Sequence, residues 1–185
     1  MRNKELFRGR RKAGRLVGLV LTLALAVSLL SGCGQSKERL TFGTGGTAGT
    51  YYSYGGVLAQ YITNNTNVKV TAVSTGGSKA NLQSVQDGDF QLGFVQSDVM
   101  AYAWDGVRAF EQDGATHDFR TLGGLYAETV QLFTMDPDIK TVEDLKGKSV
   151  SIGAANSGVY FNALDVLNAG GITLDDIHPQ YLSFE

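Results

Sequence analysis

The chain has 185 residues, of which 24 are glycine, two are proline and one is cysteine, and its formal net charge is −2. A single cysteine excludes a disulfide framework and a metal site built from cysteines. The near-neutral balance argues against a nucleic-acid-binding protein, because such proteins attract phosphates with an excess of Lys and Arg. We therefore expect no nucleic-acid partner, and the length suffices for one hydrophobic core of ordinary size.

The N-terminal segment differs in charge from the rest of the chain. Residues 1–32 contain seven basic residues and one acid, a net charge of +6, which leaves nine basic and 17 acidic residues, or −8, for the remainder. Residues 16–30 then form an apolar run of 15 residues without a charge. This run is short for a bilayer span of about 20 residues, but it is typical of a secretory signal. We predict that residues 1–32 are a signal peptide of the lipoprotein type.

The end of the apolar run resembles the lipobox of bacterial lipoproteins. Leu30, Ser31 and Gly32 precede Cys33, the single cysteine, whose thiol takes a diacylglycerol in that motif before the signal is removed. The alternatives are a buried structural cysteine or the end of an uncleaved anchor helix. Residues 33–39 then form a polar tether. The resemblance implies an extracytoplasmic protein anchored to the bacterial membrane by lipid on Cys33, a location that disfavours ATP- or NAD-dependent chemistry.

Residues 40–110 repeat one pattern three times: a short strand, a polar loop and a helix with apolar positions at helical spacing. Such alternation implies a parallel sheet with right-handed crossovers, in which the loops meet at the carboxyl edge and ligands bind there. The predicted strands are residues 40–43, 68–73 and 90–95, the loops are 44–50, 74–78 and 96–98, and the helices span 51–63, about 80–87 and 99–110.

The pattern changes after Gly114. Residues 120–126 and 130–135 are predicted to be extended with no helix between them. A short helix and turn over residues 139–150, a strand over 150–153, a polar turn and a helix over 160–168 follow, and Gly170 and Gly171 end that helix before a last polar turn at Asp175 and Asp176. We divide the chain into lobe 1 (40–118), inter-lobe segments (119–138) and the start of lobe 2 (139–185).

Lobe 2 contains too few elements for a complete lobe. Two strands and one helix cannot close a sheet that buries both faces. We therefore expect a truncated second lobe, in an N-terminal fragment or an incomplete gene product.

The glycine-rich loop does not predict a nucleotide site. Residues 43–48 fit the pattern G-x-G-x-x-A, but Ser74 and Thr75 stand where a dinucleotide site needs an acid, and no Gly-Lys-Ser/Thr follows for a phosphate loop. We expect no cofactor and no metal. What the loops offer is backbone N–H groups at helix N-termini, which favour a small anion. The alternative is that these glycines only make tight turns.

Residues for catalysis are scarce, so we do not expect an enzyme. His117 and His178 lie in polar segments, where solvent exposure is their simplest interpretation, and Ser157 lies in Ala-Asn-Ser-Gly rather than a nucleophile elbow. Glu128 is either a solvated side chain or an inward polar contact at the lobe junction. Tyr51, at the start of a predicted helix, either walls a ligand pocket or packs on the sheet.

Several motifs in order resemble the TAXI family, the solute receptors of tripartite ATP-independent periplasmic (TRAP) transporters. The resemblance covers about residues 40–185, and its weakest part is Asp-Leu-Lys-Gly-Lys at 144–148, which many related binding proteins share. The motifs lie at residues 43–52, 74–82, 96–98, 125–128, 144–148 and 157–158.

This resemblance implies an α/β protein with the two-lobe fold of type II periplasmic binding proteins. It further implies that a small organic anion, an amino acid such as glutamate or a dicarboxylate, binds between the lobes and is delivered to the membrane permease subunits of a TRAP transporter. Family members extend beyond residue 185. The binding positions carried over are Gly46, Thr50, Tyr51, Thr75, Ser78, Asn81, Gln96, Asp98, Glu128, Ser157 and Gly158. The alternatives are the substrate-binding lipoprotein of an ABC importer and an exported hydrolase.

Overall fold

The strand–loop–helix pattern of the sequence folds into a parallel sheet. In the computed structural model, which describes residues 37–185, β1 (Glu38–Gly43), β2 (Val68–Val73) and β3 (Leu92–Gly93) are ordered β2-β1-β3, with both neighbouring pairs parallel. The predicted α/β class is confirmed. The predicted signal peptide and the predicted lipidation site Cys33 lie outside the described residues. Among the described residues, no helix is long and apolar enough to cross a membrane.

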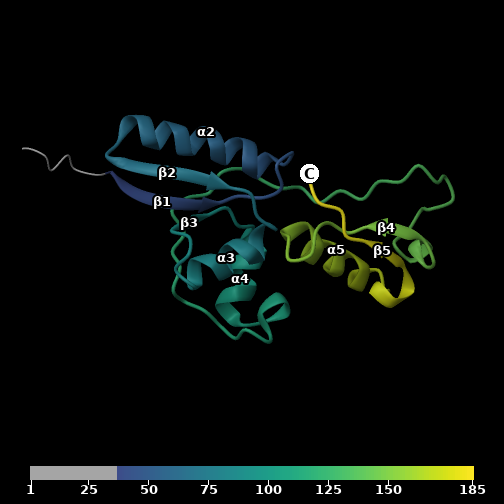
Figure 1. Ribbon diagram of the computed structural model, residues 1–185. Helices are drawn as coiled ribbons and strands as arrows, with labels where there is room; N and C mark the ends of the chain where they lie inside the picture. The colour runs from purple at the N-terminus through teal and green to yellow at the C-terminus, as the bar shows by residue number, and fades with distance from the viewer. Residues whose placement is uncertain (1–36) are drawn as a thin grey trace, which may run out of the picture. The chain divides into compact units, whose positions relative to one another are not determined.

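Helices cover both faces of this sheet (Figure 1). The helix α2 (Thr50–Asn65) packs on one face, while α3 (Ser78–Gln86) and α4 (Ser97–Asp105) lie on the other. We call the part from β1 to the short 3₁₀ helix η1 (Arg108–Phe110) the three-stranded module. Because its strands are parallel, the three loops that follow them meet at one edge.

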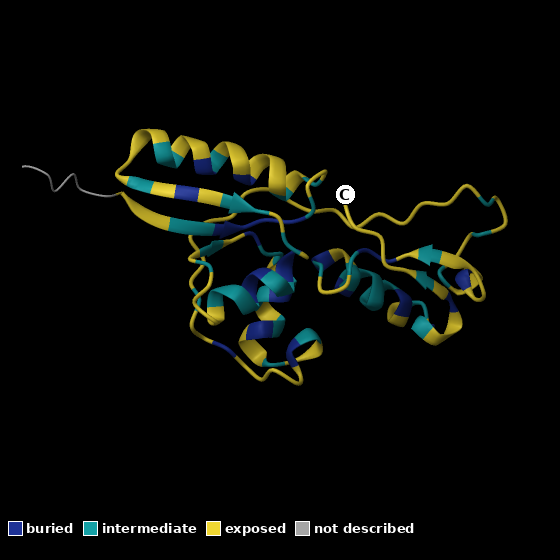
Figure 2. Cartoon of the chain, in the orientation of Figure 1, coloured by how far each residue is buried: buried dark blue, intermediate teal, exposed yellow. Residues whose placement is uncertain are grey.

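Two apolar clusters hold the three-stranded module together. Between α2 and the sheet lie Phe42, Ala59, Val70 and Phe94, and the rings of Phe42 and Phe94 are 4.6 Å apart. On the opposite face, Leu82, Val99, Ala103 and Phe110 are buried together with Phe161 from a later helix. Figure 2 shows the buried residues on the sides of the strands and helices that face one another. The predicted amphipathic pattern is thus realised as two separate clusters.

Two predicted elements are shorter than expected. The strand predicted at 90–95 contains only Leu92 and Gly93; beyond it the Phe94 N–H bonds to Gly43 O at 3.0 Å, while the Phe94 carbonyl accepts from the buried side chain of Asn81 at 2.8 Å. The helix predicted to reach residue 110 ends at Asp105, because Gly106 adopts a left-handed conformation with φ 66° and caps it.

A second, two-stranded module follows, comprising residues 143–180. It contains η2 (Glu143–Leu145), β4 (Ser149–Ser151), α5 (Gly158–Ala169), η3 (Leu174–Asp176) and β5 (His178–Gln180), with β4 and β5 parallel. The end of α5 at Gly170 and Gly171 is confirmed, since both N–H groups bond to the last turn. The polar turn predicted at residues 175–176 is η3, and β5 follows it as the second strand of this module. The core of this module is Leu145, Ile152, Leu167, Ile172 and Ile177.

The connecting segment, predicted to be extended over residues 120–126 and 130–135, contains neither a helix nor a strand. None of the described strands lies within residues 119–135, and none pairs with them. The side chains of Leu122, Phe133 and Met135 are at least 85% exposed. Backbone pairing depends on a partner strand as well as on local propensity. The proposed boundaries between lobes remain predictions.

Helices α4 and α5 are joined by a tyrosine–aspartate hydrogen bond. The Tyr102 hydroxyl donates to Asp165 Oδ2 at 2.6 Å, and this bond, followed by partial burial, raises the pKa of Tyr102 from 10.0 to about 12. Because the folded pKa lies above the unfolded one, the added stability is fully present below pH 10 and is lost as the pH rises through 12.

We expect Tyr102→Phe to lower the free energy of unfolding by about 1 kcal/mol at pH 7, the usual net contribution of such a bond. Urea unfolding at pH 7 and pH 11.5 measures this, and the difference from wild type should shrink at the higher pH. Tyr61→Phe, at a side chain 65% exposed on α2, is the control and should change little. Equal stability of Tyr102→Phe and wild type at pH 7 would contradict the prediction.

Candidate ligand-binding site

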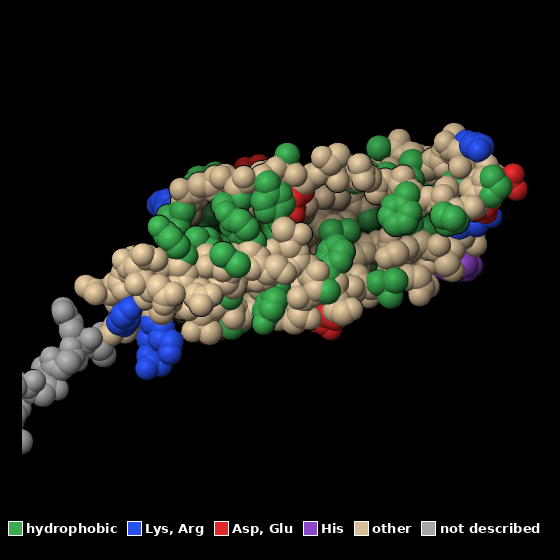
Figure 3. All heavy atoms as spheres, turned by 90° about the horizontal axis from the view of Figure 1, so that it is seen from above, with side chains coloured by type: hydrophobic (Ala, Val, Ile, Leu, Met, Phe, Trp, Pro, Cys, Tyr) green, Lys and Arg blue, Asp and Glu red, His purple; other side chains and the backbone are tan. Residues whose placement is uncertain are grey.

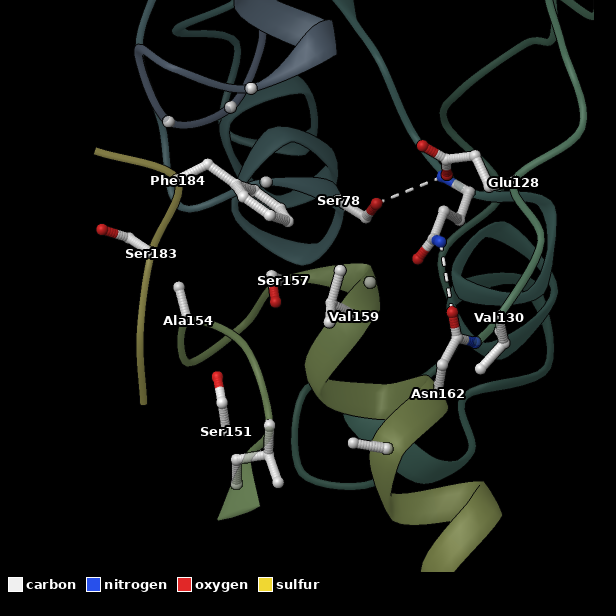
Figure 4. Close-up of a pocket in the computed structure, with 18 of the residues that line it drawn as sticks. Ser78, Glu128, Val130, Ser151, Ala154, Ser157, Val159, Asn162, Ser183 and Phe184 are labelled. Carbon is white, nitrogen blue, oxygen red and sulfur yellow. Dashed lines mark hydrogen bonds between the residues drawn. The ribbon is translucent and has the colours of Figure 1, made fainter. Parts of the chain in front are cut away.

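A cavity of about 800 Å³ lies where the two modules meet (Figure 4). One wall is formed by the three loops at the carboxyl edge of the first sheet. The other is formed by the end of β4 and the first turns of α5, with residues 128–132 and 183–185 completing it. The predicted meeting of the three loops on one rim is therefore confirmed, and the second module supplies a facing wall.

Hydrogen bonds between the first two loops fix their shape. Gly45 O accepts from the Ser74 hydroxyl at 3.0 Å, and the Thr75 hydroxyl donates to Thr44 O at 3.1 Å. The turn into α3 passes through Gly77 with φ 103° and ψ −150°, a conformation open to glycine but strained for other residues. The glycines thus do make tight turns, and those turns point helix N-termini at the cavity.

Three helix N-termini line the cavity. Thr50 and Tyr51 belong to α2, Gly77 and Ser78 to α3, and Ser157 and Gly158 to α5. The first N–H groups of a helix have no acceptor within it, and the first turns of these three helices contain no acidic residue that would offset their positive ends. At α5 the Ser157 hydroxyl accepts from the Tyr160 N–H at 3.1 Å. This wall favours a ligand group with negative charge.

Two further hydrogen bonds involve side chains of this wall, and the second of them ends at Glu128. The Gln96 N–H donates to Ser78 Oγ at 3.1 Å, and the Tyr51 hydroxyl donates to Glu128 Oε2 at 3.0 Å. Burial, and next the charge of Glu128, raise the pKa of Tyr51 far above its ordinary value, so this hydroxyl remains a donor. Burial and the same carboxylate also raise the pKa of Tyr126. Glu128 thus makes a polar contact with Tyr51 while its side chain remains exposed to solvent, so features of both predicted alternatives are present.

No basic side chain offsets this carboxylate. The described residues that line the cavity include no Lys, Arg or His. Figure 3 shows a hollow in this face of the molecule, and no Lys or Arg side chain borders it. The site therefore combines a helix-end wall that favours anions with a carboxylate that favours a cationic or N–H donor group.

Nine of the eleven predicted binding residues line the cavity, and Asn81 and Asp98 do not. Asn81 is fully buried and donates to Thr44 O and Phe94 O at 2.7 and 2.8 Å, so it supports the loops from beneath. Asp98 accepts from Asn162 Nδ2 at 2.6 Å and stands behind the wall. The direct ligand role remains a prediction for the nine, which are Gly46, Thr50, Tyr51, Thr75, Ser78, Gln96, Glu128, Ser157 and Gly158.

Several lining residues were missed from the sequence. Asn162 lies one helical turn after Gly158, a spacing that would have indicated it, whereas Ser151, Val130 and Phe184 follow no motif. Phe184 is held in place because its carbonyl accepts from the Ala48 N–H at 2.7 Å. These residues belong to segments that reach the cavity through the tertiary fold, and no local sequence pattern indicates this.

The described residues contain no catalytic constellation around Ser157. Its hydroxyl caps α5, and both histidines are exposed and lie outside the cavity lining. His117 Nε2 is 3.0 Å from Trp104 O. Among the described residues no group of three His, Cys, Asp or Glu is placed to hold a metal ion.

Comparisons with known proteins give one family and two similar folds. Residues 42–185 match the profile of the NMT1-like family. The alkanesulfonate-binding protein SsuA from Xanthomonas axonopodis pv. citri, bound to MOPS, is similar at 18% identity with a TM-score of 0.43. The periplasmic aliphatic sulphonate-binding protein SsuA from Escherichia coli is similar at 20% identity with a TM-score of 0.44. Each similarity covers 78% of this chain but only 47% and 44% of the respective SsuA chain, so this chain spans less than half of their length.

Proposed function

The chain belongs to the NMT1-like family, and on that basis we propose that it is an extracytoplasmic solute-binding protein, which holds a small ligand between two lobes and delivers it to a membrane transporter. The observation that carries this proposal is the cavity of about 800 Å³ with walls from both modules. That volume lies within the range of small-molecule sites. A ligand that touches Ser78 on one wall and Ser157 on the other favours the closed arrangement, because only that arrangement supplies both sets of contacts.

The charges in the cavity favour an amino acid over a dicarboxylate. A ligand carboxylate suits the three helix N-termini. An ammonium group suits Glu128, whereas a second carboxylate near Glu128 would meet a like charge with no described cation in the lining to offset it. We therefore propose an α-amino acid such as glutamate as the ligand.

The transporter partner is proposed from the ordered motifs between residues 43 and 158 that resemble TAXI receptors. The proposal is a TRAP permease driven by an ion gradient, with the receptor tethered to the membrane by lipid on Cys33. A receptor for an ABC importer would keep the same cavity and change only the partner. Uptake into vesicles separates the two, since the first needs an ion gradient and the second needs ATP.

Calorimetric titration of the full-length receptor tests the ligand proposal. We expect L-glutamate or L-glutamine to bind at least about tenfold more tightly than succinate or 2-oxoglutarate, a difference of about 1.4 kcal/mol. Equal binding of succinate and L-glutamate would contradict the amino-acid proposal. Absence of binding for all four compounds would count against the solute-binding role.

A further inference from the structure

Helices α4 and α5 present matching polar residues to each other. On α4, Asp98 and Tyr102 are four residues apart, and on α5, Asn162 and Asp165 are three apart, so each pair lies on one face of its helix. The Asn162 side-chain N–H donates to Asp98 at 2.6 Å, and the Tyr102 hydroxyl donates to Asp165 at 2.6 Å. Arg108 Nη2 lies 3.4 Å from the second oxygen of Asp165. The two modules are thus joined by a ladder of polar contacts.

Asp98 determines how two cavity residues are oriented. A carboxylate only accepts, so the amide nitrogen of Asn162 must face Asp98 and the oxygen of Asn162 must face away from it. That oxygen accepts from Gln96 Nε2 at 3.2 Å, the bond that ends at Asn162 in Figure 4. Gln96 and Asn162 line the cavity, whereas Asp98, Tyr102, Arg108 and Asp165 do not. The chain of contacts therefore reaches the cavity wall from behind.

Backbone strain is concentrated at the contacts between the modules. Among the described residues, the non-glycine residues with positive φ are Arg108 (53°) and Asn156 (65°). Arg108 contacts Asp165, and the Asn156 carbonyl accepts from the Lys79 N–H at 3.1 Å. A left-handed conformation is unfavourable for Arg and persists only where the surroundings hold it, whereas Asn tolerates it. Here the surroundings are contacts to the other module.

The joint between α4 and α5 has an apolar part and a polar part. Phe161, Tyr160 and Leu164 of α5 pack against the apolar cluster around Leu82, Val99 and Ala103. Beside this cluster lie the hydrogen bonds of Asp98 and Asp165 and one partly exposed ion pair. Because hydrogen bonds are directional, the polar part determines how the two helices are aligned.

We propose that the α4–α5 ladder is a latch that holds the two modules in the closed arrangement in the ligand-free protein as well, and that Asp98 and Asp165 are positioning residues that raise ligand affinity without touching the ligand. This inference rests on the proposed solute-binding function. The latch stabilises the closed arrangement, so its loss shifts the population towards the open one and lowers the apparent affinity by the same factor.

The test compares Asp98→Ala and Asp165→Ala with Asp105→Ala, an exposed residue at the end of α4, in the full-length receptor. Titration with L-glutamate should show about a tenfold loss of affinity for the first two variants and none for the third. The loss should lie in a faster dissociation rate. A lower unfolding stability with unchanged affinity would overturn the latch and leave only a structural contact.

Hydrogen exchange on the ligand-free receptor separates failure of the latch from failure of the proposed function. We expect amides of α5 to exchange faster in Asp165→Ala than in wild type, while the sheet amides of β1 and β2 remain unchanged. Faster exchange of α5 in Asp165→Ala supports the latch whether or not L-glutamate binds the wild-type receptor. Failure of L-glutamate to bind would reject only the proposed ligand. Equal exchange of α5 in Asp165→Ala and Asp105→Ala would overturn the latch.

Discussion

Glu128→Gln is expected to weaken amino-acid binding by about 100-fold. A hydrogen bond to a charged group contributes about 1.5–3 kcal/mol, and each 1.4 kcal/mol is a factor of ten. The substitution keeps the shape of the side chain and an oxygen that can accept from the Tyr51 hydroxyl, which now donates at 3.0 Å. What it removes is the negative charge that lies beside Tyr51 in the cavity lining. Calorimetric titration with L-glutamate measures the effect.

The same variant should gain affinity for dicarboxylates relative to wild type, because the like charge near a second ligand carboxylate is gone. Glu111→Gln is the matched control, since Glu111 is exposed and does not line the cavity. Both variants lose one negative charge, so a general electrostatic effect would affect them equally. Unchanged affinity of Glu128→Gln for L-glutamate would show that the ligand does not use this carboxylate.

Gly158→Ala is expected to reduce ligand affinity by about 30- to 100-fold while leaving the fold intact. The Cβ of an alanine at position 158 would overlap the side-chain oxygen and Cδ of Gln96. Gln96 is long and can swing away, so the cost to unfolding stability is small. Its displacement breaks the 3.2 Å bond to Asn162, and the added methyl covers the N-terminus of α5. Titration with L-glutamate and urea unfolding of the same samples measure both quantities.

Two comparisons show whether displacement of Gln96 is the cause. Gly56→Ala adds the same methyl inside α2, where nothing lies within 4 Å, and should leave affinity unchanged and raise stability by about 0.5–1 kcal/mol. In the double variant Gly158→Ala with Gln96→Ala, the loss should be smaller than the sum of the two single losses, since both remove the same contact. Additive losses would refute this cause.

The parts of the site that could be predicted are those that depend on residues close together in the sequence. The loops after β1, β2 and β3 were predicted because glycines, polar residues and apolar periodicity within about ten residues define a turn between a strand and a helix. Once the strands are parallel, those loops meet at one edge without further information. Thr50, Thr75 and Ser78 reach the cavity for this reason.

The same local reasoning placed Asn81 and Asp98 in the binding set, although neither lines the cavity. Both stand near the start of a helix, where the sequence cannot show which way a side chain turns. Asn81 turns under the loops to satisfy two buried carbonyl groups, because such groups are costly when left unpaired. Asp98 turns towards Asn162 of the other module.

The sequence by itself determined the α/β class, the three loops and the absence of basic residues from loops 44–50, 74–78 and 96–98, because these depend on neighbours along the chain. Only the tertiary structure decided that Glu128 contacts Tyr51, 77 residues away, and that Asn162 contacts Asp98 and Gln96, 64 and 66 residues away. Such pairs follow from how one module packs on another, which depends on the summed burial of many side chains and not on any motif. The segments predicted to be extended at residues 120–126 and 130–135 contain no helix and form no strand, because a strand needs a partner and the described residues provide none.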